Sequence, residues 1–451
     1  MESFERIYFI GIGGIGMSAL ARYFRFHGKK VSGYDKTETE LTKLLINEGI
    51  PVHYEENLGL APKDVQLVVY TPAVNKDNIE LQFYQQHGYR IMKRSDVLGV
   101  ITSSSFNICV AGTHGKTTIS TMIAHILRYS GYGCNAFLGG ISVNYNTNFW
   151  SDPNNVCVVE ADEYDRSFLK LSPDIALISA MDADHLDVYG TEEALQDAFV
   201  QFSQKLKKGG LLISKYGLIQ DKKLCAERHI RYHISDVKAD IFAEKIRLEN
   251  GGYVFDIVMG KWKLEDIFLN IGGRHNIENI IAAIAAIHDL GIDDDRIKKA
   301  VAAFKGVKRR FEYIVKNDHQ LFIDDYAHHP EELMALITGV KDLYPGLKNL
   351  LIFQPHLFSR TRDLADLFAR SLDLADEVIL LPIYPARELP IEGVTSAMIF
   401  DKMNNKHKHL MDKTEILNWV KERKIDLLVT AGAGDIDGLI NPIKEIIEKM
   451  N

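Results

Sequence analysis

Residues 109–118 read CVAGTHGKTT, and this stretch decides the fold of the middle of the chain. It overlaps an apolar run at 107–111 that is typical of a buried strand, and it leads into residues 118–129, whose apolar positions have helical spacing. A strand, a glycine-rich turn and a helix together form the setting in which a helix N-terminus binds phosphate. The sequence therefore predicts a phosphate loop at this point.

The loop departs from the strict pattern G-x-x-x-x-G-K-[ST], because Val110 stands where the first glycine belongs. The parts that bind phosphate are nevertheless present: backbone N–H groups at a helix start, the amine of Lys116, and the hydroxyl of Thr117, which suits Mg²⁺. The alternative is a loop that contains Gly-Lys-Thr by chance, and the flanking strand and helix count against it. We expect this loop to bind a nucleotide phosphate.

A second glycine-rich turn lies near the start of the chain. Residues 11–16 read GIGGIG, between a predicted strand at 7–10 and a helical pattern at 17–28, and a further strand at 30–34 leads to Asp35. The pattern G-x-G-x-x-G, followed about 20 residues later by an acidic residue, is typical of dinucleotide binding. The same backbone approach holds any nucleotide diphosphate. These residues alone leave open NAD, a nucleotide-linked substrate and a packing role.

Two acidic segments follow apolar strands in the middle of the chain. Glu160 begins EADEYDRSF directly after the strand at 156–159, at the carboxyl edge of a sheet, where ligands bind. It either binds Mg²⁺ or belongs to a solvated acidic loop. After the strand at 175–178, the segment MDADHLDVYG contains Asp182, Asp184, His185 and Asp187. A lone histidine there is often structural, but the neighbouring acidic cluster and phosphate loop favour a metal role for His185.

Further polar clusters lie toward the C-terminus. Asn276 follows a glycine pair at the start of an apolar helix predicted over 276–290, where it either caps the helix or contacts a ligand. Charged and histidine residues then gather just after apolar strands, in RRFE (309–312), DDYAHHP (324–330) and FQPHLFSRTRD (353–363). Such clusters suit an anionic substrate or a transition state, and surface ion pairing is the alternative.

Length and composition exclude several classes of function. A chain of 451 residues is too long to fold around one hydrophobic core, and a typical size of about 150 residues per domain predicts three domains. With a net charge of −8 and no basic stripe, nucleic acid is not an expected partner. The N-terminus is acidic, unlike a secretory signal, and the longest apolar stretch, 280–287, is too short to cross a bilayer. We therefore expect a cytoplasmic protein without membrane contact.

The four cysteines show no CxxC spacing and mostly have apolar neighbours in the sequence. This usage predicts reduced core residues rather than disulfides or a zinc site. The cysteines are Cys109, Cys134, Cys157 and Cys225.

Strands alternate with helices along the whole chain, which predicts three α/β domains in series with mostly parallel sheets. The expected boundaries are 1–104, 105–305 and 306–451. Further strands are predicted at 65–70 and 90–92 in the first domain, at 210–214 in the second, and at 321–323, 349–353, 377–381 and 427–430 in the third.

Ten motifs in a fixed order resemble one family, the Mur ligases, which build the peptide of bacterial cell-wall precursors. They are GIGGIGMSALA, AGTHGKTT, FLGG, EADEYDRSFL, DADHLDVYG, GRHNIENIIAA, FKGVKRRFE, DDYAHHP, FQPHLFSRTRDL and AGAGDI. Each motif is weak alone, but the ordered set covers nearly the whole chain and is specific. Within the family, GMS after the first glycines and the histidine in GTHGKT resemble the members that add L-alanine.

The resemblance implies an α/β fold with a Rossmann-like N-terminal domain, a central P-loop ATPase-type domain and a C-terminal Rossmann-like domain. It implies that the first domain holds the diphosphate of UDP-N-acetylmuramate, not of NAD, through Gly11, Gly13, Gly14, Gly16 and Asp35. ATP and Mg²⁺ are the implied cofactors. The implied ATP-binding residues are Gly112, Thr113, His114, Gly115, Lys116, Thr117, Thr118, Asn276, Arg310 and Asp325.

The implied reaction forms an amide through an acyl phosphate: the substrate carboxylate attacks the γ-phosphate of ATP, and the amine of L-alanine then displaces phosphate. The implied metal ligands are Thr117, Glu160 and His185. We expect a monomer or a weak homodimer. The implied catalytic residues are Lys116, Glu160, His185, His328 and Arg360, with His328 near the amino acid.

Two positions depart from patterns of the family. Ala198 and Phe199 stand in the region where members that add later amino acids carry a carbamylated lysine, so no carbamate bridge between metals is expected. Leu357 stands where many alanine-adding members have arginine, and we expect Arg360 or Arg362 to take over its substrate contacts.

Three other functions compete with this interpretation. The nearest is a cell-wall recycling ligase that attaches a preformed tripeptide to UDP-N-acetylmuramate, although the glycine loop of such relatives differs from GIGGIGMS. A nicotinamide-dependent oxidoreductase would leave GTHGKTT, EADE and DADH without a role. A non-catalytic nucleotide sensor would show phosphate release that never depends on an acceptor amine.

Overall fold

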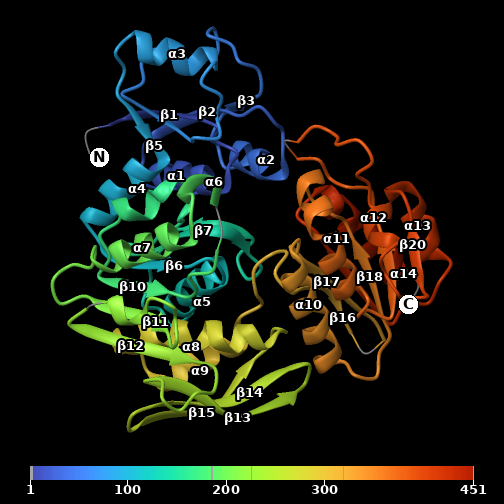
Figure 1. Cartoon of the computed structure of the whole chain (residues 1–451). Coiled ribbons are helices and arrows are strands. Elements are labelled where there is room, and N and C mark those ends of the chain that lie inside the picture. The colour runs from blue at the N-terminus through green and yellow to red at the C-terminus, as the bar shows by residue number, and fades with distance from the viewer. Residues whose placement is uncertain (1–3, 184–185, 225, 318, 387, 450–451) are drawn as a thin grey trace. The chain divides into compact units, whose positions relative to one another are not determined.

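The computed structural model describes residues 4–183, 186–224, 226–317, 319–386 and 388–449, in a mixed α/β fold with three sheets (Figure 1). The first sheet has the strand order β3-β2-β1-β4-β5, and all its pairs are parallel. Its strands are β1 (Arg6–Ile10), β2 (Lys30–Tyr34), β3 (Val52–His53), β4 (Leu67–Tyr70) and β5 (Ile91–Lys93), with helices α1 (Ile15–Phe26), α2 (Glu40–Asn47), α3 (Ile79–Gln86) and α4 (Arg94–Ser103).

The second sheet has the order β15-β14-β13-β12-β11-β10-β6-β9-β7-β8. The parallel strands β10, β6 and β9 are neighbours, so their carboxyl ends lie at one edge of the sheet. The strands are β6 (Phe106–Ala111), β7 (Asn135–Ser142), β8 (Thr147–Trp150), β9 (Val156–Glu160), β10 (Ile175–Ile178), β11 (Leu211–Lys215), β12 (Arg228–His233), β13 (Ile241–Glu249), β14 (Gly252–Met259) and β15 (Trp262–Leu269). The helices are α5 (Lys116–Tyr129), α6 (Leu186–Tyr189), α7 (Glu192–Ser203), α8 (Arg274–Asp289) and α9 (Asp294–Ala303), with short 3₁₀ turns at Tyr164–Lys170 and Asp221–Lys223.

The third sheet has the order β16-β17-β21-β18-β19-β20, parallel except for the edge pair of β16 and β17. Its strands are β16 (Glu312–Lys316), β17 (Leu321–Asp325), β18 (Asn349–Phe353), β19 (Glu377–Leu380), β20 (Lys408–Leu410) and β21 (Leu427–Ala431). The helices are α10 (Pro330–Leu343), α11 (Phe358–Leu372), α12 (Ala397–Phe400), α13 (Lys413–Lys421) and α14 (Ile440–Lys449), with a 3₁₀ turn at Asp435–Leu439.

The chain forms two compact units. The first comprises Met1–Lys245, Phe255–Ile267 and Glu278–Phe304, and the second comprises Ile246–Val254, Phe268–Ile277 and Lys305–Asn451. This division into two units does not test the three domain boundaries that we expect from the sequence, which remain a proposal.

Within the first unit, α1 packs against β7 and β8, and one hydrophobic core contains residues of both the first and the second sheet. The ring of Tyr23 lies 5.4 Å from that of Phe137 and 6.2 Å from that of Phe149. Arg22 is buried and donates to the side chain of Asn148. These contacts join α1 of the first sheet to the second sheet in one packed body.

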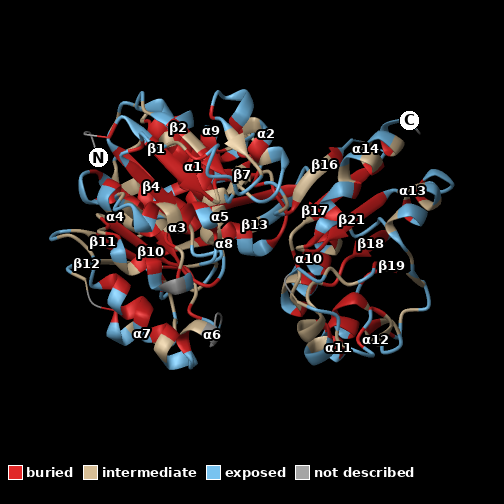
Figure 2. Cartoon of the chain, turned by 90° about the horizontal axis from the view of Figure 1, so that it is seen from above, coloured by how far each residue is buried: buried red, intermediate tan, exposed pale blue. Residues whose placement is uncertain are grey.

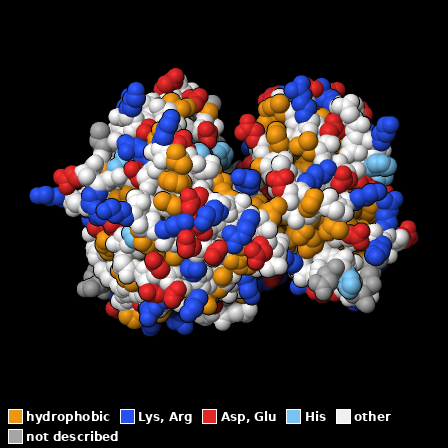
Figure 3. Space-filling model, turned by 90° about the horizontal axis from the view of Figure 1, so that it is seen from below, with side chains coloured by type: hydrophobic (Ala, Val, Ile, Leu, Met, Phe, Trp, Pro, Cys, Tyr) orange, Lys and Arg blue, Asp and Glu red, His pale blue; other side chains and the backbone are white. Residues whose placement is uncertain are grey.

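The strands are largely buried and the helices carry the exposed surface, as Figure 2 shows. Cys109, Cys134 and Cys157 are buried, as predicted for core residues, and Cys225 lies outside the described residues. Figure 3 shows acidic and basic side chains intermixed on the face drawn. In the described part of the chain, no helix has the length and apolar character needed to cross a bilayer.

Element positions agree with the sequence to within a few residues. The helix after the phosphate loop begins at Lys116, two residues before the predicted start, and α8 begins at Arg274. The sequence did not identify the antiparallel pair of β7 and β8, nor the strands β12 to β15. Ala198 and Phe199 lie buried in α7, so this part of the helix offers no amine that could be carbamylated.

Candidate active site

The phosphate loop joins β6 to α5, as the sequence predicts. Gly112 and Gly115 have φ angles of +131° and +82°, which favour glycine. A Cβ atom at position 112 would overlap the side chain of Ser179. Val110 lies inside the buried strand β6, so the turn begins after it and needs no glycine there. Because α5 begins at Lys116, the N–H groups of its first turn lie at the loop.

Glu160 ends β9 beside the start of α5. Its Oε1 accepts a hydrogen bond from Thr117 Oγ1 at 2.9 Å, and its Oε2 accepts one from the Gly139 N–H at 3.0 Å. A Cβ atom at position 139 would overlap this carboxylate. Burial raises the pKa of Glu160, and the nearby Lys116 ammonium opposes the shift. The carboxylate is therefore fixed in direction and placed where a cation is favourable.

Lys116 is held by two oxygen acceptors. Its Nζ donates to the Gly112 carbonyl and to Oε1 of Glu163, each at 2.7 Å. Glu163 is buried, burial raises its pKa, and the Lys116 charge opposes that shift. The sequence did not name Glu163, although it lies in the EADE motif. Lys116 and Glu163 are 47 residues apart, so no short stretch of the sequence indicates that they are in contact.

Thr117 and Glu160 fit the ligand set of Mg²⁺, which takes one or two protein oxygens together with substrate phosphates and waters. Their oxygens lie 2.9 Å apart at the start of a phosphate-binding helix. The described residues include no group of three His, Cys, Asp or Glu side chains that could hold a metal without such help. His185, the third predicted ligand, lies outside the described residues.

The glycine turn of the first domain joins β1 to α1, which begins at Ile15. Gly11 has a φ of +82°, and the Gly13 N–H donates to Asp35 Oδ2 at 2.7 Å. A Cβ atom at position 13 would lie 2.8 Å from that oxygen and 2.7 Å from a methyl carbon of Thr42. Asp35 thus secures the turn itself, and its contact with a nucleotide stays a prediction.

A cavity of about 270 Å³ lies in the first unit between this turn and Glu160. Its lining includes Gly14, Gly16, Gly139 and Arg94. Arg94 Nη2 lies 3.5 Å from a carboxylate oxygen of Asp162. Sequence reasoning missed Arg94, whose position directly after the predicted strand at 90–92 could have revealed it. A concave site with a backbone turn and a guanidinium suits an anionic nucleotide.

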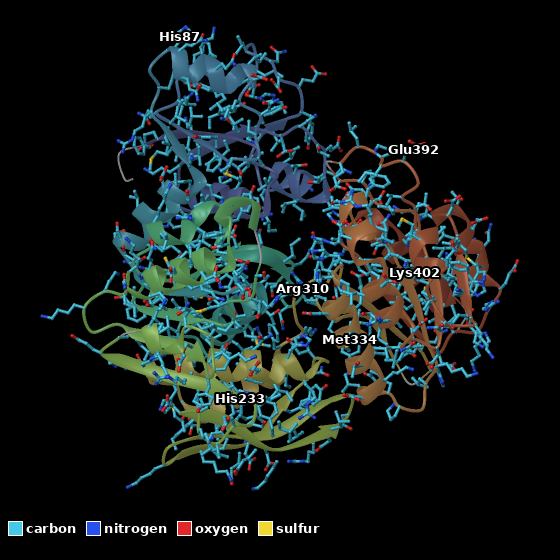
Figure 4. All side chains as sticks on the ribbon, viewed as in Figure 1. His87, His233, Arg310, Met334, Glu392 and Lys402 are labelled. Atoms are coloured by element: carbon cyan, nitrogen blue, oxygen red, sulfur yellow. The ribbon has the colours of Figure 1, made fainter. Side chains whose placement is uncertain are left out.

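In the second unit, His328 and Arg360 belong to one cluster with His356. The ring centroids of His328 and His356 are 5.9 Å apart. Burial lowers the pKa of His328. Burial also lowers the pKa of His356, and the charge of Arg360 adds to this effect, so that the pKa of His356 is about 4. Arg310, labelled in Figure 4, places its guanidinium 5.2 Å from the centroid of the Tyr326 ring. The sequence did not name His356, although it lies in FQPHLFSRTRD.

Two other predicted nucleotide ligands contact local backbone in the second unit. Asp325 accepts from the N–H groups of Phe311 and Ala327, each at 2.7 Å, and burial raises its pKa. The Asn276 amide donates to the Gly272 carbonyl at 2.6 Å in the first turn of α8. Their contacts with ATP stay predictions.

Asp324 provides a test of the electrostatics of the second unit. Thr430 donates to it at 2.6 Å, Arg309 Nε lies at 3.3 Å, and burial raises the pKa of Asp324 to about 7. The unfolded chain releases this proton near pH 4, so the contribution to stability is present below about pH 4 and is lost as the pH rises toward 7. We expect the urea midpoint of the wild type to fall relative to that of Asp324→Asn as the pH is raised from 5 to 8.

The control for this experiment is the exposed residue Asp401, whose substitution Asp401→Asn should leave the pH dependence unchanged. If the urea midpoint of the wild type instead rose relative to that of Asp324→Asn between pH 5 and pH 8, the buried carboxyl would be stabilised in its charged form.

The fold and these residues define an α/β protein with a phosphate loop and a second glycine-rich turn, each at the start of a helix. Three family models match the chain: the Mur ligase family catalytic domain at 6–105, the Mur ligase middle domain at 110–287, and the Mur ligase glutamate ligase domain at 309–434. The chain belongs to the Mur ligase family.

Relatives along the full length agree. The chain is 47% identical to the UDP-N-acetylmuramate--L-alanine ligase of Flavobacterium johnsoniae, over 100% of this chain and 99% of the relative. It is 48% identical to the enzyme of that name from Parabacteroides distasonis, over 98% and 97%. Among solved structures, the UDP-N-acetylmuramate-alanine ligase of Thermotoga maritima matches with a TM-score of 0.83 and 28% identity, over 99% of each chain.

Proposed function

We propose that this protein is an ATP-dependent ligase that joins L-alanine to the carboxylate of UDP-N-acetylmuramate in peptidoglycan precursor synthesis. The observation that carries the proposal is the full-length identity of 47% to a relative with that activity in its name. A murein peptide ligase from Psychrobacter arcticus shares 23% identity and a TM-score of 0.69, which is a likeness of fold alone. The tripeptide-adding alternative therefore has less support.

In the proposed reaction, the carboxylate of the nucleotide sugar attacks the γ-phosphate of ATP, which breaks the bond to the β-phosphate and releases ADP. The amine of L-alanine then attacks the acyl phosphate, loses a proton and displaces inorganic phosphate. Lys116 and the N–H groups of α5 offset the charge that develops on the transferring group. Arg94 and the glycine turn orient the nucleotide sugar, and Arg360 and His328 receive the amino acid. The assignment of these roles rests on the positions of these residues just after the carboxyl ends of strands in the three sheets, where ligands bind in α/β proteins.

A bound Mg²⁺ would neutralise phosphate charge, and we propose that Thr117 and Glu160 would hold it. The 2.9 Å hydrogen bond between their oxygens supports this role, because both side chains already converge on one point. His185 stays a predicted metal ligand. The cytoplasmic location and the monomeric or weakly dimeric state also stay predictions. The proposed boundaries 1–104, 105–305 and 306–451 belong to the same set of predictions.

Phosphate release with ATP and Mg²⁺ tests the proposed function. We expect release only when both UDP-N-acetylmuramate and L-alanine are present, because the acyl phosphate needs the first and its turnover needs the second. Each substrate is omitted in turn, and the product is identified by mass spectrometry. Steady release with ATP alone would contradict the ligase, and release without an acceptor amine would favour a nucleotide sensor.

A competition assay separates the two ligase activities. With UDP-N-acetylmuramate, ATP and equal L-alanine and L-Ala-γ-D-Glu-diaminopimelate, the alanyl product should dominate, because a site for a small amino acid lacks room for a tripeptide. Glycine and serine should react weakly, since one small group changes binding by about 1–3 kcal/mol. Predominant tripeptide product would assign the chain to cell-wall recycling.

A further inference from the structure

The start of α11 is a separate short segment of helix in the second unit. Leu364 has non-helical angles, φ −118° and ψ 15°, so the helix is kinked there. Arg360 lies before the kink, within the first turn, and the remainder of the helix is packed through residues such as Phe368 and Leu372. The packing of the long part therefore does not by itself fix the direction of Arg360.

The residue before this segment has an uncommon backbone conformation. Leu357 has a φ of +71°, in the region that favours glycine, and it is the N-cap residue of α11 without a side-chain hydrogen bond to the helix. Its N–H donates to the carbonyl of Tyr384 at 2.9 Å, in the loop that follows β19. A strained cap persists only where its surroundings fix it, so this loop sets the entry of the chain into α11.

Glu388, from the same loop, caps the helix in place of Leu357. Its Oε2 accepts the Ser359 N–H at 2.9 Å, and its Oε1 accepts the Ser359 hydroxyl. A carboxylate at this position satisfies N–H groups that have no partner inside the helix and interacts favourably with the helix dipole. Glu388 thus ties the loop to Ser359, the residue directly before Arg360.

Two polar atoms next to this cap await a partner. Within the described ranges, Arg360 Nη1 and His356 Nδ1 are buried and have no hydrogen-bond partner. The His356 ring stacks on Tyr384, with centroids 5.8 Å apart and an interplanar angle of 21°. Both side chains are half-buried, but a buried nitrogen without a partner is costly unless a ligand satisfies it, and a carboxylate matches a guanidinium.

We propose that Glu388 is a positioning residue for Arg360: by capping the first turn of α11, it directs the guanidinium toward the carboxylate of the incoming amino acid. This inference rests on the proposed function, because it takes the ligand to be L-alanine. Glu388 touches the helix start and no reacting atom, so it acts through Arg360. Its loss should weaken binding of the amino acid and leave both nucleotides unaffected.

Steady-state kinetics of Glu388→Ala test the proposal. We expect the KM for L-alanine to rise about tenfold, the size of a lost helix cap, while kcat and the KM values for ATP and UDP-N-acetylmuramate change by less than about threefold. Glu388→Gln keeps an acceptor oxygen and should recover most of the loss. Glu392 is exposed in the same loop region (Figure 4), and Glu392→Ala should match the wild type.

A second measurement does not need turnover. Hydrogen exchange of a peptide covering residues 356–363 should be faster in Glu388→Ala than in Glu392→Ala, because the capped Ser359 N–H loses its acceptor. If the wild-type protein showed no alanine-dependent phosphate release, that result would refute the proposed function, and hydrogen exchange would still test the role of Glu388 as a cap. An active wild type whose Glu388→Ala variant has an unchanged KM for L-alanine, or raises all three KM values equally, would refute the role of Glu388. Unchanged exchange would refute the cap.

Discussion

Replacement of Lys116 by alanine should lower kcat by at least about a hundredfold, the usual cost of removing one preorganised donor to a developing charge. The Lys116 ammonium lies at the start of α5, within 2.7 Å of the Gly112 carbonyl and of Glu163. Its charge is the part of the loop that can offset the charge of a transferring phosphoryl group. No other residue of the loop carries a fixed positive charge, so none can replace it.

The measurement is alanine-dependent phosphate release, with binding of UDP-N-acetylmuramate measured separately by calorimetry. Binding should persist, because the nucleotide sugar is expected at the first glycine turn. Lys222→Ala, an exposed lysine of the same domain, serves as the matched control and should retain wild-type rates. A Lys116→Ala variant with normal turnover would remove this residue from the proposed ATP site.

Gly139→Ala should be nearly as damaging as Glu160→Ala, with a loss of about a hundredfold or more in kcat. The new Cβ atom would overlap both carboxylate oxygens of Glu160, which Thr117 and the Gly139 N–H hold in place. The carboxylate must therefore turn away from Thr117. If these two side chains hold Mg²⁺, the variant should also require a higher Mg²⁺ concentration for half-maximal rate.

A Mg²⁺ titration of the rate measures this effect in wild type, Glu160→Ala and Gly139→Ala. Gly346→Ala is the control for a glycine substitution, because no atom lies within 4 Å of its added Cβ. If Gly139→Ala kept the wild-type rate and Mg²⁺ dependence, the direction of the Glu160 carboxylate would be irrelevant to the reaction, and its assignment as a metal ligand would fail.

Local patterns predicted the parts of the site that depend on the backbone near them. The phosphate loop, the glycine turn and Glu160 each follow a buried strand directly, so strand and turn signals are enough to place them at a sheet edge. The structure shows that β9 and β10 lie on either side of β6, which brings the loop and Glu160 together. The three-sheet α/β fold follows from the same alternation of elements.

Contacts between distant segments could not be predicted in this way. The Gly139 N–H meets Glu160 across 21 residues, and Lys116 meets Glu163 across 47. Such pairs depend on strand order and on the β7 and β8 hairpin, which short windows of sequence do not encode. Leu357 is a related case: a leucine gives no sign of a positive φ, because the loop that fixes its conformation comes later in the chain.

The packing of α1 against β7 and β8 bears on any attempt to dissect the protein. A fragment ending at residue 104 would leave Tyr23 without its partners Phe137 and Phe149, and Arg22 would lose Asn148. Newly exposed aromatic surface of this kind promotes self-association. The part of the chain that contains the first sheet is therefore a poor candidate for expression by itself. It should unfold together with the second sheet in one cooperative transition, because the two sheets share one core.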